Sequence, residues 1–169
     1  MNLTKIKSYR DRDAFIEEVK KHTYELEVKC HGCAQVIVQS FLDVLDIDAP
    51  AVSLAASPMA AGLALTGNNC GAVMGSLMIL GMQYGRSNIY DGMDGIVKGI
   101  RPARRFIKYF QGKHGNINCR DITGTDLSNP ENAKAYFDSG GLEKCANILS
   151  DAAGHVAGTL YDEMISYDK

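Results

Sequence analysis

Apolar residues recur every three to four positions along most of the chain, which is the period of an α-helix. Strand signals are nearly absent, because no alternating run of β-branched residues is present. The pattern predicts helices over residues 11–28, from 33 onward, 51–65 with an interruption at Pro58, from 70 onward, 96–110, a short helix from 130, and 142–165. We therefore expect an all-α fold, a single-domain helical bundle of about six helices that spans residues 1–169.

The same periodicity predicts which side chains face the core. On the first helix these are Ile16, Val19, Thr23 and Leu26. On the second helix they are Val36, Ile37, Ser40, Phe41, Val44 and Leu45. On the helix over 96–110 they are Ile96, Ile100, Ala103, Ile107 and Phe110. On the last helix the predicted stripe consists of Cys145, Ile148, Leu149, Ala152, Val156 and Leu160.

Breaks between these helices carry recognisable turn chemistry. Asn129-Pro130-Glu131 predicts an N-cap followed by proline in the first helical turn. A loop is expected over residues 111–129. Gly71 and Gly75 lie one turn apart on the helix that begins at Cys70, so another backbone can approach that helix closely.

Charge excludes some functional classes. The 169 residues carry a formal net charge of −2, which gives no overall field to attract nucleic acid or an anionic membrane. Residues 49–85 hold no charged side chain, but prolines and glycines divide this stretch into pieces shorter than the ~20 residues that span a bilayer. The N-terminal segment is polar, without the apolar run of a secretory signal. We expect a soluble, cytoplasmic protein with neither nucleic-acid nor membrane partners.

Five cysteines are the candidate chemistry. Cys33, Cys70 and Cys145 each begin the apolar stripe of a different predicted helix, and Cys119 lies in the predicted loop. The N-terminus of a helix stabilises a thiolate, which favours nucleophilic or metal-bound sulfur. A free cysteine also packs well as a small apolar residue, so packing remains an alternative.

Cys30 and Cys33 form a C-x-x-C pair at the start of a predicted helix. No βαβ pattern surrounds the pair, as it would in a thioredoxin-like protein. Haem attachment is not expected, because Ala34 stands where the haem motif has histidine. A zinc site would more often show a second close pair.

Other polar groups are further candidates for function. Arg101, Arg104, Arg105 and Lys108 make a basic helical face that suits an acidic partner, a phosphate-bearing ligand or plain solvation. The histidines at 31, 114 and 155 could assist sulfur or metal chemistry, and none is assigned a role.

The cysteine pattern resembles a known family. Residues 69–75 carry C-G-A-x-x-G, with Gly32-Cys33-Ala34-Gln35 upstream and Cys119 and Cys145 downstream. This arrangement is similar to the C_GCAxxG_C_C family over about residues 33–156. The resemblance implies that Cys33, Cys70, Cys119 and Cys145 are the family's four cysteines. It also implies a redox role and a prokaryotic source.

A related domain occurs in split-Soret cytochromes, where it is associated with an iron–sulfur site. The resemblance therefore makes an iron–sulfur cluster a candidate cofactor, while haem is not expected. Cys30 is additional to the family's four cysteines and is either a resolving thiol for Cys33 or an accidental neighbour.

The leading hypothesis is a redox protein with a four-cysteine centre. Cys33, Cys70, Cys119 and Cys145 suit an iron–sulfur cluster, a zinc site or two dithiol pairs. The rivals are a thiol-disulfide oxidoreductase that uses Cys30 and Cys33, and a helical interaction protein with packed cysteines. The expected partner is a redox protein or a small-molecule oxidant or reductant, and a homo-oligomer is left open. We expect the four cysteines to lie together and, without metal, Cys70 to be among the more acidic thiols.

Overall fold

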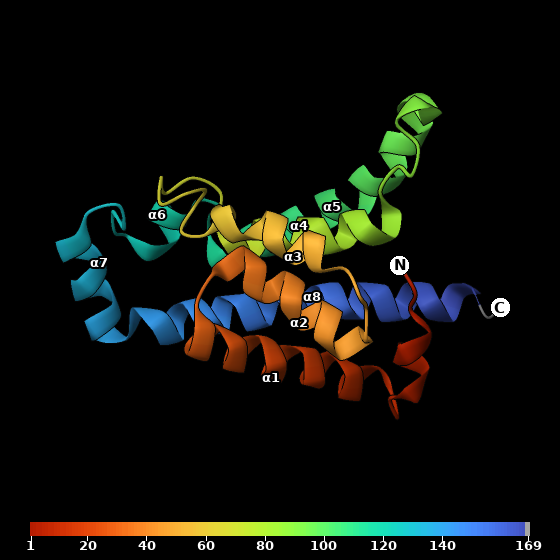
Figure 1. Cartoon of the computed structure of the whole chain (residues 1–169), viewed down its shortest axis with the longest axis horizontal. Coiled ribbons are helices and arrows are strands. Elements are labelled where there is room, and N and C mark those ends of the chain that lie inside the picture. Colours follow the sequence, from red (N-terminus) through yellow and green to blue (C-terminus); the bar gives the residue numbers. More distant parts are fainter. Residues whose placement is uncertain (168–169) are drawn as a thin grey trace.

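The computed structural model describes residues 1–167 and confirms the all-α fold (Figure 1). The helices are α1 (Arg12–Cys30), α2 (Cys33–Leu45), α3 (Pro50–Ala56), α4 (Gly71–Tyr84), α5 (Gly92–His114), α6 (Cys119–Thr123), α7 (Pro130–Tyr136) and α8 (Leu142–Tyr167). Shorter turns are η1 (Thr4–Ser8), η2 (Ser57–Met59), η3 (Ile89–Asp91) and η4 (Phe137–Gly141). None of the helices over this range has the length and apolarity needed to cross a membrane.

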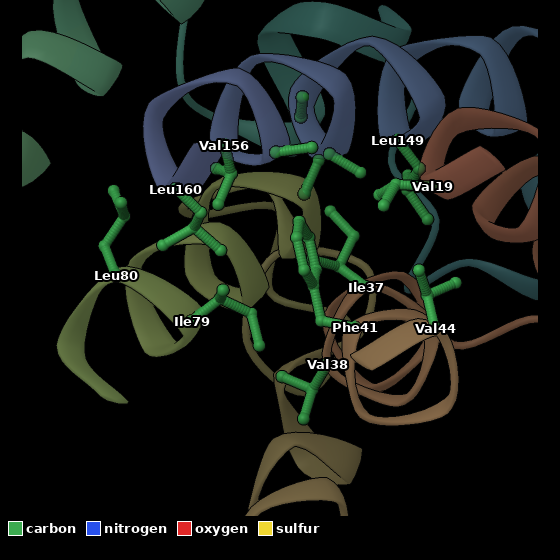
Figure 2. Packing of buried hydrophobic residues seen from close by; sticks show 14 of the residues in the cluster. Val19, Ile37, Val38, Phe41, Val44, Ile79, Leu80, Leu149, Val156 and Leu160 are labelled. Atoms are coloured by element: carbon green, nitrogen blue, oxygen red, sulfur yellow. The ribbon is translucent and has the colours of Figure 1, made fainter. Parts of the chain in front are cut away.

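The main core lies where α2 packs between α1, α4 and α8 (Figure 1). Helix α1 runs along α8, which is the most extensive helix pairing in the described chain. Figure 2 shows apolar side chains from α2, α4 and α8 converging, among them Phe41, Ile79 and Val156, each fully buried. The predicted inward face of the second helix is confirmed, because all six of its residues are buried. The stripe of the last helix is buried except for Cys145, which is half-buried.

Local capping explains where several helices begin and end. The Asp11 carboxylate accepts a hydrogen bond from the Ala14 N–H at 2.8 Å and so starts α1. The predicted N-cap of α7 is confirmed, since the Asn129 side chain accepts from the N–H groups of Glu131 and Asn132. Gly140, at a φ of 90°, breaks the helical backbone between α7 and α8.

The inward face predicted for the first helix was partly wrong. Its buried residues follow a spacing of four and are Phe15, Val19, Thr23 and Glu27, whereas Ile16 and Leu26 are only half-buried. A helix that lies along one neighbour for its whole length buries an i, i+4 row, and α1 lies along α8 in this way. Thr23 is accommodated because its hydroxyl bonds the Val19 carbonyl and the Ser40 hydroxyl.

Two further predictions of local structure were wrong. The segment after Pro58 does not continue as a helix, because Ala61, Leu63, Ala64 and Leu65 all have left-handed backbones with φ between 49° and 67°. The loop predicted over 111–129 contains α6, so that Cys119 begins a short helix.

Helix α5 is longer than the predicted 96–110, and of its predicted inward residues Phe110 is confirmed as buried. Its buried residues are Pro102, Phe106 and Phe110, while Ile100 is exposed and Ile96, Ala103 and Ile107 are half-buried. The outer part of α5 projects beyond the bundle (Figure 1), and Met93, Val97 and Ile100 are exposed there.

Candidate functional site

Four of the five cysteines line one small cavity of about 140 Å³. Cys33 begins α2, Cys70 is the N-cap of α4, Cys119 begins α6 and Cys145 lies in the first turn of α8. The expectation that these four cysteines lie together is confirmed by their shared cavity. Cys30 is exposed at the end of α1 and does not line the cavity.

Two glycines bring Cys33 toward Cys70 by letting α4 approach α2. A Cβ atom on Gly71 would lie 2.3 Å from the Cβ of Cys33, and one on Gly75 would lie 2.6 Å from the Ala34 carbonyl oxygen. Neither distance is possible for a real side chain, so the predicted close approach is confirmed. The glycines of the C-G-A-x-x-G sequence are therefore packing positions.

Backbone hydrogen bonds bring Cys70 toward Cys119. The Cys70 N–H donates to the Ile117 carbonyl, and the Cys119 N–H donates to the Asn68 carbonyl, both at 2.7 Å. These bonds surround an isolated antiparallel bridge between Asn69 and Asn118. The chain segments that precede the two cysteines are thus held in a fixed register.

Cys145 is positioned by the turn between α7 and α8. Its sulfur lies 3.5 Å from the Tyr136 hydroxyl. Gly141 permits this contact, because a Cβ atom there would overlap the Tyr136 ring at 2.3 Å. The neighbouring Lys144 ammonium donates to the Ile122 carbonyl at 2.8 Å and ties α8 to α6.

The left-handed segment after Pro58 covers the cavity beside Cys33. The backbone N–H of Ala61 bonds the Cys33 sulfur, and Ala60 and Ala61 line the cavity. A left-handed backbone costs a non-glycine residue about 1–2 kcal/mol. Internal hydrogen bonds offset part of this cost, including those from the Ala64 N–H to Pro58 and from the Asn68 N–H to Gly62.

Glu27 is a cavity residue that sequence reasoning missed. Glu27 is 3 % exposed. Its Oε1 atom accepts a hydrogen bond from the Cys33 thiol at 3.9 Å, and its Oε2 atom has no hydrogen-bond partner. Burial raises the pKa of Glu27 to about 7. The available signal was its position four residues after Thr23, in the row that continues from Phe15 and Val19.

Burial raises the pKa of each cavity thiol. For Cys70 the pKa rises to about 12, even though the backbone N–H groups of Ala72 and Val73 favour the thiolate. For Cys119 it rises to about 11, through burial and then the charge of Cys145. The pKa values of Cys33 and Cys145 are also raised, with burial as the main cause. The expectation of a comparatively acidic Cys70 was wrong, because desolvation outweighs the donors of the first helical turn.

The four cysteines line the cavity without forming a site for a single metal ion. Among the described side chains, no three from His, Cys, Asp and Glu lie close enough together to hold a single metal ion. Of the three histidines considered, His31 lines the cavity. His114 pairs with Asp151 at 3.0 Å, and His155 stacks on Tyr109 with ring centroids 3.8 Å apart.

Comparison with known proteins places the chain in a family. No curated protein and no solved structure matches it. A family model described as "Putative redox-active protein (C_GCAxxG_C_C)" matches residues 31–159, which include the four cavity cysteines and exclude Cys30 and Glu27. Since the match covers most of the sequence, the chain belongs to the C_GCAxxG_C_C family.

Proposed function

We propose that Cys33, Cys70, Cys119 and Cys145 hold an iron–sulfur cluster and that the protein carries electrons between redox partners. One observation carries this proposal: four thiols from four separate helix starts line one buried cavity in a member of a redox-active family. Four cysteine thiolates are the usual ligands of [2Fe–2S] and [4Fe–4S] clusters.

The donor set and its arrangement fit a cluster better than a single zinc ion. Thiolates select zinc and iron–sulfur centres among biological metals. A zinc ion needs its sulfurs about 2.3 Å from one point and has no redox chemistry of its own. The cavity thiols instead surround a space, which suits an inorganic core of several atoms.

The electrostatics of the cavity also fit an iron–sulfur cluster. The Glu27 carboxyl has an oxygen without a partner, and burying an unpaired carboxylate is costly. Raised pKa values keep the thiols protonated when no cation is near, whereas a coordinated metal deprotonates a thiol outright. The iron of a cluster core would supply positive charge to the thiolates, while the raised pKa of Glu27 favours a protonated carboxyl beside a centre that is negative overall.

The remaining residues have defined tasks in this proposal. Bound there, a cluster supplies one-electron chemistry to the protein. Ile148, Leu149 and Leu127 form apolar walls that exclude water from the sulfurs. Once Cys145 is a thiolate, the Tyr136 hydroxyl would donate a hydrogen bond to its sulfur, and the Ala61 N–H donates to the sulfur of Cys33. Such bonds tune a reduction potential.

The hydrogen bond between Cys33 and Glu27 favours a second candidate, a dithiol centre. Glu27 would accept the proton of Cys33 when that thiolate joins a second cavity thiol. Formation of the disulfide releases two electrons and two protons, and an external disulfide would take both. The raised pKa of Cys33 and the burial of Cys70 and Cys119 weigh against this candidate, because reactive cysteines usually have a lowered pKa and are partly exposed.

Anaerobic purification of the full chain tests the proposal. We expect iron and acid-labile sulfide in stoichiometric amounts and visible absorption that dithionite bleaches. Serine variants of Cys33, Cys70, Cys119 and Cys145 should each lose iron, whereas Cys30→Ser should retain it as the matched control. Stoichiometric zinc without iron, or a metal-free protein in which only thiols titrate, would contradict the cluster.

A further inference from the structure

The outer end of α5 and the preceding turn η3 carry a concentrated set of exposed apolar side chains. Ile89 is 67 % exposed, Tyr90 90 %, Met93 69 %, Val97 37 % and Ile100 50 %. They are five of the ten exposed large apolar side chains in the described part of the chain. In Figure 1 this green segment projects from the bundle, away from α6 and the cysteine end of the molecule. The projection is unrelated to the cavity and needs a separate explanation.

The spacing of these residues is that of a helix-pairing seam. Met93, Val97 and Ile100 follow intervals of four and three residues, which places them in one row along α5. Ile89 and Tyr90 lie in η3, before the non-helical Gly92, and are not part of this row. A row with this alternation is the narrow a and d seam of a two-stranded helical pair. The side of α5 that packs on its own bundle is a different one, formed by Pro102, Phe106 and Phe110. The outer row is therefore left without a partner helix.

Charged residues beside this apolar row indicate which partner helix can pack against it, and in which orientation. If Val97 is an a position, Met93 and Ile100 are d positions, and Asp94 and Arg101 both fall at e. In an antiparallel pair the e flank of one helix faces the e flank of the other. Two copies of this seam therefore bring Asp94 of each copy to Arg101 of the other.

In a parallel pair, Asp94 and Arg101 would instead face the side of the partner helix that packs on its own bundle. That side offers them no residue of opposite charge. An anionic membrane surface would meet Asp91 and Asp94 at the outermost turn of the helix, which disfavours a lipid occupant. The charge pattern is complementary to itself under two-fold symmetry, as an isologous interface requires.

We propose that the outer part of α5 pairs antiparallel with the same segment of a second copy, forming a two-fold dimer through Met93, Val97 and Ile100. In this dimer each Asp94 lies beside the Arg101 of the other copy. The two cysteine cavities face away from the interface, so they stay accessible to redox partners.

Sedimentation equilibrium of the full chain tests the dimer. We expect a mass of twice 18.4 kDa, with the dissociation constant raised about tenfold or more by Val97→Glu. Leu54→Glu is the matched control, since Leu54 is 69 % exposed on α3 and isolated from the seam. Circular dichroism checks that each variant keeps its helices.

A charge exchange tests the orientation. Asp94→Arg alone and Arg101→Asp alone should each weaken the dimer, and the double variant should restore it, because each pair is then re-formed with reversed signs. A monomeric wild-type chain would overturn the proposal. So would a dimer that is insensitive to Val97→Glu, or a monomer that binds anionic vesicles through this segment.

Discussion

Glu27 is a buried carboxylic acid whose environment offers it one weak hydrogen bond. Its pKa is raised by burial from 4.5 to about 7, so without metal the folded chain holds a proton there that the unfolded chain has lost. Between these two pH values the folded state binds more protons, and the free energy of unfolding falls as the pH rises. The loss is complete above the folded pKa and amounts to about 3 kcal/mol.

Glu27→Gln should remove this pH dependence in metal-free protein. Glutamine cannot ionise and can still accept a hydrogen bond from Cys33, so stability should stay nearly level where the wild type loses about 3 kcal/mol. Urea unfolding at pH 4.5 and pH 8 measures the difference. Glu25→Gln, on the exposed side of α1, should keep the wild-type dependence. A full pH slope in Glu27→Gln would show that another group causes it.

Between elements, the contact that shapes the site is the one between α2 and α4. Gly71 and Gly75 face Cys33 and Ala34, where backbone and Cβ atoms leave no space for a methyl group. Gly81 lies on the same helix as Gly75, and a Cβ atom added to it would have no other atom within 4 Å. Comparing alanine variants of Gly75 and Gly81 therefore separates two contributions to stability. One is the packing of α4 against α2, and the other is the intrinsic helix propensity of the residue.

Gly75→Ala should destabilise the protein by about 1–3 kcal/mol, because α4 must move away from α2. Gly81→Ala should instead stabilise it by up to about 1 kcal/mol, since alanine is the better helix former and meets nothing. Urea unfolding of both variants at one pH provides the comparison. Equal changes in stability would mean that the close approach is not required in solution.

Across the whole molecule, the cavity lies where two apolar clusters meet. Cys70 belongs to the main core and Cys33 packs against it. Cys119 belongs to a small second cluster with Leu127 and Tyr136, and Cys145 packs against that cluster. A centre held by all four cysteines would therefore join the large core to a segment that has little apolar burial of its own.

If the four cysteines hold the proposed cluster, its removal should loosen residues 115–141 more than the rest of the chain. A chelator releases the ligands from both clusters, and the small cluster alone buries too little to stay closed. Hydrogen exchange followed by mass spectrometry should show faster exchange in this segment, with α1 and the middle of α8 unchanged. Uniform acceleration along the chain would indicate global unfolding instead.

Several features followed from the sequence alone because their causes are local. The inward face of α2 follows from helical periodicity, the Asn129 cap from the reach of a side chain to its own backbone, and the Gly71 and Gly75 approach from the absence of a Cβ. The family pattern added the four cysteines, and three of them were expected at helix starts.

Other features were decided only by which segments pack together from distant parts of the sequence. Glu27 became a cavity residue because α1 packs beside Cys33. The pKa of the Cys70 thiol is raised because neighbours from several distant segments exclude water from it. The short helix α6 begins where residues 117–120 form backbone hydrogen bonds with residues 67–70, which lie far away in the sequence. Helical periodicity and capping act within a few residues, whereas desolvation depends on the neighbours that the completed fold supplies.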